Sequence, residues 1–135
     1  MVAVHTGLQL IAEALEADAR IERVWYPGLP SFPQYDLARR ELRYAGGLIT
    51  FDVVGGREAG QRFVESTEIA QLAKSLGGPE TLVTHPASTT HAGLLPEELA
   101  GAGIGEGTIR LSVGLEHADD LLADLRQALD ASMRA

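Results

Sequence analysis

The stretch GGLITFDVVGG, residues 46–56, decides the fold of this chain. It is apolar and rich in β-branched residues, and a glycine pair stands at each end. β-branched side chains favour strands, and paired glycines are typical of turns. The stretch therefore predicts a strand with a change of direction on both sides. A second run, TIRLSVG at residues 108–114, alternates apolar and polar side chains and predicts another strand.

Helical patterns surround these two strands. The spacing of apolar residues predicts helices at residues 6–18, 34–42, 57–67, 96–103 and 118–133. Thr6 is expected to cap the first helix, and Pro96 opens the fourth, where its missing N–H group costs nothing. The third of these helices is expected to bury Ala59, Phe63 and Val64.

Shorter strands are predicted at residues 21–26 and 80–85, and the proline-rich segment 27–34 predicts a loop. Residues 68–78 fit either a strand or a helix, and we expect a strand up to Ala73 with a glycine turn after it. Short connections between the later strands favour antiparallel pairing. We therefore expect one α+β domain over residues 1–135, with a mostly antiparallel sheet and helices packed over one face. Because these helices cover only part of the sheet, some apolar surface is expected to remain for a partner.

The composition narrows the class of protein. The chain has 135 residues, a formal net charge of −8 and no cysteine. The absence of cysteine excludes disulfides, thiolate metal sites and a cysteine nucleophile, and it fits a reducing compartment. The negative charge disfavours nucleic-acid binding. The N-terminal segment has the pattern of neither a signal peptide nor a membrane span, so we expect a soluble cytoplasmic protein without a nucleic-acid or membrane partner.

The segment HPASTTH, residues 85–91, raises the question of a metal site or a nucleophile. His85 and His91 are six residues apart, which is not the spacing of zinc-binding helices. We expect their ring nitrogens to bond loop carbonyls instead. Ser88 lacks the glycine-flanked turn that activates the serine of hydrolases. Serine and threonine beside proline favour local backbone bonds, so the segment predicts a shaped loop and no metal site.

Two basic residues, Arg110 and Lys74, are candidates for a binding or catalytic role. If Ile109 and Leu111 face the core, Arg110 between them points to the other face of the sheet. Its planar guanidinium matches a carboxylate with two parallel bonds, so its partner is either a ligand or one of the chain's own acids. Lys74 is the only lysine and stands just before a glycine turn. A Schiff-base role and simple solvation are both open for it on this pattern.

Several segments together resemble one enzyme family. The segments KSLGGPETLVTHPASTTH (residues 74–91), LPEEL (95–99) and GIGEGTIRLSVGLEHADDLLADLRQAL (103–129) are similar to the C-terminal part of the trans-sulfuration enzymes. RIERVWYPGLPSFPQYDLARREL (20–42) and GGLITFDV (46–53) match the same family in order and spacing. These are the pyridoxal-phosphate enzymes of cysteine and methionine metabolism, such as cystathionine gamma-synthase and gamma-lyase, methionine gamma-lyase and O-acylhomoserine sulfhydrylase. The resemblance covers about the whole chain, and the joint occurrence of SLGG, HPAxxTH and RLSVGxE is highly specific.

The resemblance implies the small C-terminal domain of the fold-type I, aspartate aminotransferase-like enzymes, with residues 1–19 resembling the helix that links it to the cofactor domain. Arg110 matches the arginine that grips the α-carboxylate of the amino-acid substrate, and Ser75 matches the serine of the SLG turn that helps to hold it. Leu76 is placed beside the cofactor–substrate space, and Thr90 matches a threonine near that pocket. Fixing the carboxylate orients the bond to be broken relative to the conjugated ring system.

Lys74 is where this sequence departs from the family. Many members that handle cystathionine have glutamate just before SLG, and methionine lyases often have a small apolar residue there. A cation would not attract the distal ammonium group of cystathionine. We therefore expect Lys74 to favour an uncharged or anionic substrate tail, such as that of an acylated homoserine. The family's Schiff-base lysine belongs to the other domain, so Lys74 is not its counterpart.

The resemblance also implies that this chain is one part of a larger enzyme. The domain with the Schiff-base lysine and the phosphate contacts has no match here, so we expect no catalytic residue, no pyridoxal 5'-phosphate on this chain alone, and no activity in isolation. The expected partners are the amino-acid substrate, the missing cofactor domain and further copies, because family members usually form tetramers. The alternatives are a free-standing binding or oligomerisation module without the catalytic half, and a small enzyme that uses Lys74 or the Ser/His loop.

Overall fold

The computed structural model describes the backbone of residues 2–134 and the side chains of residues 4–134. The elements in chain order are α1 (Val2–Glu16), β1 (Ile21–Trp25), α2 (Tyr35–Glu41), β2 (Leu48–Val53), α3 (Gly56–Ser66), β3 (Gln71–Leu72), β4 (Leu82–Thr84), the 3₁₀ turn η1 (Pro86–Ser88), α4 (Pro96–Gly101), β5 (Thr108–Ser112) and α5 (Ala118–Ser132). The helices and strands expected from the sequence are all present in the expected order, and η1 is an addition to them.

The strands form one five-stranded sheet in the order β1-β2-β5-β4-β3. The pairs β1–β2, β2–β5 and β4–β5 are antiparallel, which confirms the α+β class with a mostly antiparallel sheet. The pair β3–β4 is parallel, so the expected antiparallel pairing of the later strands is wrong at this edge. The reason is the connection over residues 73–81, which crosses the face of the sheet before β4 begins and so brings the chain back in the same direction.

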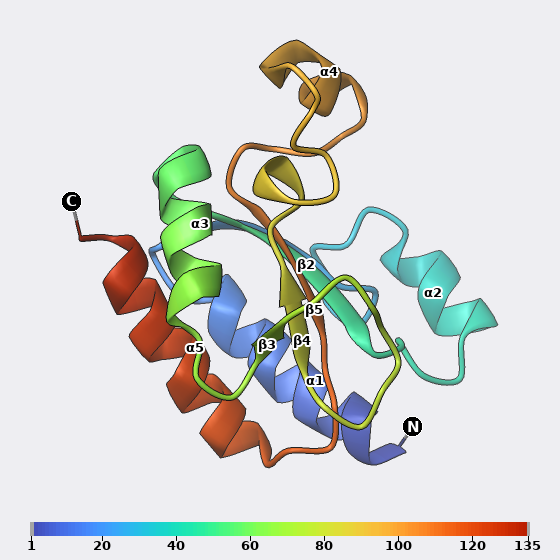
Figure 1. Ribbon diagram of the computed structural model, residues 1–135. Coiled ribbons are helices and arrows are strands. Elements are labelled where there is room, and N and C mark those ends of the chain that lie inside the picture. The colour runs from blue at the N-terminus through green and yellow to red at the C-terminus, as the bar shows by residue number, and fades with distance from the viewer. Residues whose placement is uncertain (1, 135) are drawn as a thin grey trace.

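One face of the sheet is covered by helices. The side chains of Ile49 and Phe51 on β2 and of Ile109 and Leu111 on β5 are completely buried on this face. Figure 1 shows α1, α3 and α5 gathered along it, with α5 in contact with both of its neighbours. The expectation of helices over one face is therefore confirmed, and we call these three helices the helix layer.

We call the opposite side of the sheet the open face. The register places Thr50, Arg110 and Thr84 in one row across β2, β5 and β4. Directly opposed residues of antiparallel strands have their side chains on the same face. Because Ile109 and Leu111 face the helix layer, this row projects from the open face.

The start of α1 differs from the expectation. The helix already runs from Val2, so Thr6 lies within it and is not its N-cap. Val4 packs against the same core as Leu8, which shows that the apolar stripe extends past Thr6 and favours continued helix over a cap. Helix α2 buries no residue and lies apart from the helix layer (Figure 1). No helix within residues 2–134 is long and apolar enough to cross a membrane.

Candidate functional site

The turn at residues 74–78 lies over the open face beside Arg110. Nη2 of Arg110 donates to the carbonyl oxygen of Lys74 at 2.8 Å and to that of Ser75 at 3.3 Å. The guanidinium therefore reaches from β5 across the sheet to the backbone of the turn. Arg110 and Ser75, which the resemblance assigns to one site, are neighbours in the structure.

A second bond fixes the same turn to β5. The N–H group of Gly77 donates to Oγ of Ser112 at 3.0 Å, and Ser112 is the next residue of β5 on the open face. Gly77 has a φ angle of +78°, in the left-handed region that glycine adopts without strain. The turn thus depends on a glycine at this position and is held by β5 at two points.

An apolar cavity of about 410 Å³ adjoins the turn. Leu48, Leu76 and Leu115 line it, and these side chains are 39%, 55% and 65% exposed. The cavity lies between the turn, the start of β2 and Val4 on α1. Large apolar side chains that cluster on a surface are typical of an interaction site. This surface agrees with the expectation that the helices leave apolar area for a partner.

The charge of Arg110 has no carboxylate partner in the described part of the chain. None of the ion pairs among residues 4–134 includes its guanidinium. Its Nε and Nη1 atoms donate no hydrogen bond to these residues either. Of the two partners that the sequence left open, an acid of the chain's own is thus absent from the described residues. The positive charge meets carbonyl dipoles only and can still bind an anion.

The other residues implied by the resemblance lie in two places. Lys74, Ser75 and Leu76 are exposed on the turn, and it is the carbonyl of Ser75 that contacts Arg110. Thr90 is exposed in the turn after η1, where its hydroxyl shares a hydrogen bond of 2.7 Å with Nδ1 of His91. Among the residues that the structure describes, no hydrogen bond joins Thr90 to Arg110. The structure therefore brings together the turn and Arg110 and leaves Thr90 in a separate loop.

His85 holds the loop after β4 in place. It is completely buried, with Nε2 2.6 Å from the carbonyl oxygen of Glu106 and Nδ1 2.8 Å from Oγ of Ser88. A carbonyl only accepts, so Nε2 carries the proton and Nδ1 accepts from Ser88. Burial lowers the pKa of His85, and the bond to Glu106 opposes this only in part. This confirms for His85 the expected bond to a loop carbonyl. Among residues 4–134, no group of three or more His, Asp or Glu side chains is placed to hold a metal ion.

Two polar residues in the structure were not singled out from the sequence. Thr84 is 2% exposed, and within residues 4–134 its hydroxyl has no hydrogen-bond partner. No sequence pattern indicates that Thr84 is buried and unpaired, because its burial depends on the pairing of β4 with β5. Asp124 is buried on α5, and its carboxylate accepts the N–H groups of residues 68–70. An acid on the apolar stripe of a helix is a signal that could have identified it.

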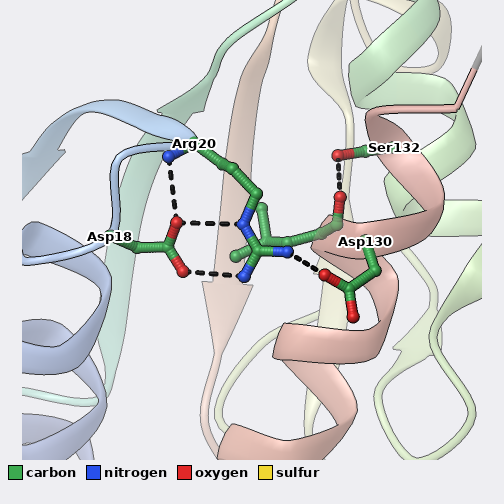
Figure 2. Close-up of polar contacts among 5 residues, drawn as sticks. Asp18, Arg20, Asp130 and Ser132 are labelled. Carbon is green, nitrogen blue, oxygen red and sulfur yellow. Dashed lines mark hydrogen bonds and ion pairs between the residues drawn. The ribbon is translucent and has the colours of Figure 1, made fainter.

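Figure 2 shows an ion-pair cluster between the turn after α1 and the C-terminal part of α5. Nε and Nη2 of Arg20 donate to the two carboxylate oxygens of Asp18 at 3.0 and 2.9 Å. Nη1 of Arg20 bonds Asp130 near the C-terminal end of α5. The hydrogen bond from Arg20 holds the pKa of Asp18 below its ordinary value. This cluster connects the turn after α1 to α5. The carboxylates of Asp18 and Asp130 neutralise the charge of Arg20.

The donor set of the open face fits a carboxylate. Arg110 offers unused N–H groups, and the exposed hydroxyl of Ser75 lies on the adjacent turn. A pyridoxal phosphate needs in addition an amine for its Schiff base and donors for its phosphate. The one lysine of the chain, Lys74, is exposed on the turn. The carbonyl oxygens of Lys74 and Ser75 point toward Arg110, and these oxygens repel a phosphate. The residues of this face fit the acid group of a substrate and do not fit the whole cofactor.

Known proteins share this sequence over nearly its full length. A family model described as "Cys/Met metabolism PLP-dependent enzyme" matches residues 1–130. The chain is 50% identical over 123 residues to the L-methionine gamma-lyase of Porphyromonas gingivalis, a match that covers 91% of this chain and 31% of that protein. It is 49% identical over 121 residues to the O-succinylhomoserine sulfhydrylase of Pseudomonas aeruginosa, covering 90% of this chain and 30% of that protein.

Solved structures share the fold as well. The crystal structure of cystathionine gamma synthase from Xanthomonas oryzae pv. oryzae in complex with cystathionine matches with a TM-score of 0.89 and 41% identity, over 98% of this chain and 34% of that one. A structure of an O-acetylhomoserine (thiol)-lyase from Campylobacter jejuni, with N'-pyridoxyl-lysine-5'-monophosphate, matches with a TM-score of 0.87 and 39% identity, over 96% of this chain and 31% of that one. The chain thus spans about a third of the length of the relatives that it matches.

Proposed function

Because this chain belongs to the family of Cys/Met metabolism PLP-dependent enzymes, we propose that it is the C-terminal part that binds the α-carboxylate of their substrate. The complete enzyme acts on a sulfur amino acid or an acylated homoserine, as a C–S lyase or in a gamma-replacement. The Schiff-base lysine and the phosphate contacts come from the remaining two thirds of the enzyme. When bound there, pyridoxal 5'-phosphate supplies an electron sink for the reaction.

The charge of Arg110 carries this proposal. The guanidinium projects from a rigid strand toward an exposed turn, and within residues 4–134 it has no carboxylate partner. A carboxylate bound there gains two charge-assisted hydrogen bonds in a fixed plane. In this proposal Ser75 adds a hydroxyl donor, while Leu76 and the adjacent cavity exclude water from the apolar part of the substrate. Thr90 contributes from the loop after η1 in the complete enzyme.

Lys74 sets the preference for the substrate tail in this proposal. Lys74 is exposed, and its own backbone carbonyl is the one that Arg110 binds at 2.8 Å. In this proposal its ammonium group faces the tail of a substrate bound to Arg110. The relatives include enzymes named for L-methionine, with an uncharged tail, and for O-succinylhomoserine, with an anionic one. Both tails are compatible with a neighbouring cation, whereas the ammonium group of cystathionine is repelled by it.

The rest of the enzyme is part of the same proposal. Leu48 and Leu115 at the rim of the cavity pack against the cofactor domain, and the complete protein is a cytoplasmic homo-oligomer. The isolated chain binds no cofactor and has no activity, because its own residues do not fit pyridoxal phosphate. Incubation with pyridoxal phosphate and borohydride should therefore leave Lys74 unmodified. An adduct on Lys74 together with turnover of an amino acid would instead favour a small independent enzyme.

A hybrid enzyme tests the role of Arg110. The hybrid is the Porphyromonas gingivalis methionine gamma-lyase in which the present chain replaces the matching third of the enzyme. Its activity is measured as thiol release from L-methionine. We expect Arg110→Lys to lower kcat/KM about 100-fold, mainly through KM, because the two parallel bonds to the carboxylate are lost. Arg126→Lys on the exposed side of α5 is the matched control and should leave kcat/KM unchanged. Full activity of the Arg110→Lys hybrid would contradict the proposal.

The same hybrid separates the remaining alternatives. Lys74→Glu should shift the preference from O-succinylhomoserine toward cystathionine, and an unchanged preference would remove the role of Lys74. A folded hybrid that is inactive even with the wild-type residues would favour the free-standing binding or oligomerisation module.

A further inference from the structure

One buried polar atom next to the proposed site has no partner. Thr84 is 2% exposed, and its Oγ1 is the one buried side-chain nitrogen or oxygen without a hydrogen bond among the residues that the structure describes. Buried hydroxyls almost always have a partner, because burial removes the water that would otherwise bond them. An unpaired hydroxyl beside a binding group therefore points to a bond that forms in another state of the site.

The place of Thr84 identifies its neighbour. Thr84 is paired with Arg110 across β4 and β5, so the two Cβ atoms lie about 5 Å apart on the open face. Arg110 reaches over this part of the sheet to the carbonyls of Lys74 and Ser75. Thr84 is therefore buried beside Arg110 on a face that no helix of the helix layer covers.

The present bonds of Arg110 compete with a carboxylate. A carboxylate held by two parallel bonds uses Nη2 together with either Nε or Nη1. Arg20 shows this pairing, since its Nε and Nη2 bond the two oxygens of Asp18. In Arg110, Nη2 is already bonded to the carbonyls of Lys74 and Ser75. A substrate carboxylate must therefore displace the turn from Nη2 at least in part.

We propose that Thr84 is a positioning residue whose hydroxyl accepts a hydrogen bond from Nε of Arg110 when a carboxylate displaces the turn carbonyls. This inference rests on the proposed function, because Arg110 must be the group that binds the carboxylate. The bond to Thr84 replaces the lost contact with the turn and fixes the plane of the guanidinium. Nη1 and Nη2 are then left to hold the two carboxylate oxygens, and Thr84 itself does not touch the substrate.

Two substitutions in the 135-residue chain test the hydroxyl. Thr84→Val removes it at nearly unchanged shape, and Thr84→Ser keeps it. L-methionine is titrated while the backbone N–H signal of Gly77 in the turn and the Nε–H signal of Arg110 are followed by NMR. Arg110→Lys identifies the second signal by its loss, and binding to this variant is read from the signal of Gly77. We expect Thr84→Val to raise the Kd about tenfold, as for the loss of one hydrogen bond to a charged group. Thr84→Ser should stay within about twofold of the wild-type Kd.

Unfolding in urea separates positioning from support of the fold. Removing an unpaired buried hydroxyl does not destabilise a protein, so Thr84→Val should unfold at the same or a higher urea concentration than the wild type. The matched control is Thr50→Val, which makes the same change on the other side of Arg110 in the same row. Because Thr50 is only half-buried, its hydroxyl has solvent as a partner, and the control should leave the Kd unchanged.

The outcomes distinguish this inference from the proposed function. If Thr84→Val binds L-methionine like the wild type while Arg110→Lys has lost binding, Thr84 has no positioning role and the proposed function stands. If Thr84→Ser weakens binding as much as Thr84→Val does, packing of the methyl group is responsible and the inference is overturned. If the wild-type chain does not bind L-methionine, or if binding survives Arg110→Lys, both the inference and the proposed function fail.

Discussion

The ion-pair cluster beside α5 and the surroundings of Arg110 on the open face differ in how far they neutralise a charged side chain. Beside α5, Arg20 bonds two carboxylates, and both oxygens of Asp18 are used in the pair (Figure 2). Asp124 on the same helix accepts three backbone N–H groups. On the open face, Arg110 has only carbonyl partners, and Thr84 next to it has none within the described residues.

This difference separates groups that hold the fold from groups that are free to bind. A charge whose hydrogen-bonding capacity is used inside the chain gives nothing further to a ligand, and its removal is felt as a loss of stability. A charge that meets only dipoles contributes little to stability and keeps its attraction for an anion. Stability and binding should therefore respond to different residues, the first to Asp124 and Arg20 and the second to Arg110.

The largest expected loss of stability follows from Asp124→Asn. Oδ2 of Asp124 accepts the N–H groups of Ile69 at 2.9 Å and Ala70 at 3.0 Å, and Oδ1 accepts that of Glu68 at 2.7 Å. Asparagine replaces one oxygen by an NH₂ group, which cannot accept. We expect the free energy of unfolding to fall by about 3 kcal/mol, as measured in urea. Asp120→Asn, exposed on the same helix, should cost less than about 0.5 kcal/mol.

Acid unfolding gives a second measure of Asp124. Burial alone would raise the pKa of its carboxyl, but the three N–H groups and Gln127 outweigh burial and hold it below the ordinary value of 3.8. The unfolded chain therefore takes up the proton first as the pH falls. The stabilisation by Asp124 is complete above that ordinary pKa and is lost as the pH falls through the folded-state pKa. Asp124→Asn should remove this part of the acid sensitivity, and an unchanged acid profile would contradict the assignment.

The second prediction compares the two arginines directly. Arg20→Met removes the ion pairs with Asp18 and Asp130 and leaves Asp18 only the backbone N–H of residue 20, and we expect the free energy of unfolding to fall by about 2 kcal/mol. Arg110→Met loses only exposed bonds to two carbonyls, and we expect a fall of about 0.5 kcal/mol. Both are measured by urea unfolding at one pH. Equal losses at the two positions would show that Arg110 is structural and would remove the distinction between the two faces.

The local pattern of the sequence predicted the elements of the fold. GGLITFDVVGG became β2, and the apolar positions Ala59, Phe63 and Val64 became the buried side of α3. Such patterns suffice because apolar periodicity records which side of an element is buried. The resemblance named Arg110 and the turn at residues 74–78 as one site, and the structure places them in contact.

The remaining features depend on contacts between distant segments. The parallel pairing of β3 and β4 depends on how the turn at residues 74–78 is fixed to β5, which no local pattern records. The burial of Thr84 needs the register Thr84↔Arg110, and the role of Asp124 needs the neighbouring backbone of residues 68–70. Thr6 was assigned as a cap because its residue type is favoured there, whereas packing of Val4 extended the helix past it.

A third prediction concerns the contact of α3 with the loop after β4. A Cβ atom on Gly60 would lie 2.5 Å from Nε2 of His85, which is itself fixed by the carbonyl of Glu106. Alanine favours helix over glycine, but this overlap outweighs the gain, and we expect Gly60→Ala to cost about 1 to 2 kcal/mol in urea unfolding. Gly101→Ala in α4 is the control, because its Cβ would meet nothing within 4 Å. A stabilised Gly60→Ala variant would show that the histidine can move.

The smallest expected effect is the pH dependence that His85 gives to the helix side of the molecule. Burial lowers the pKa of His85 from its ordinary value of 6.5, more than the bond to the Glu106 carbonyl raises it. The unfolded chain therefore binds a proton before the folded chain does, so stability should decline as the pH falls below 6.5 toward the folded-state pKa. His85→Gln should flatten this decline, as measured by urea unfolding at a series of pH values below 6.5. Arg110→Met on the open face should leave the slope unchanged, because Arg110 bonds the turn at residues 74–78 and not His85. If the stability of His85→Gln still declines as the pH falls below 6.5, the titrating group is another residue. The contrast between His85 and Arg110 would then be weaker.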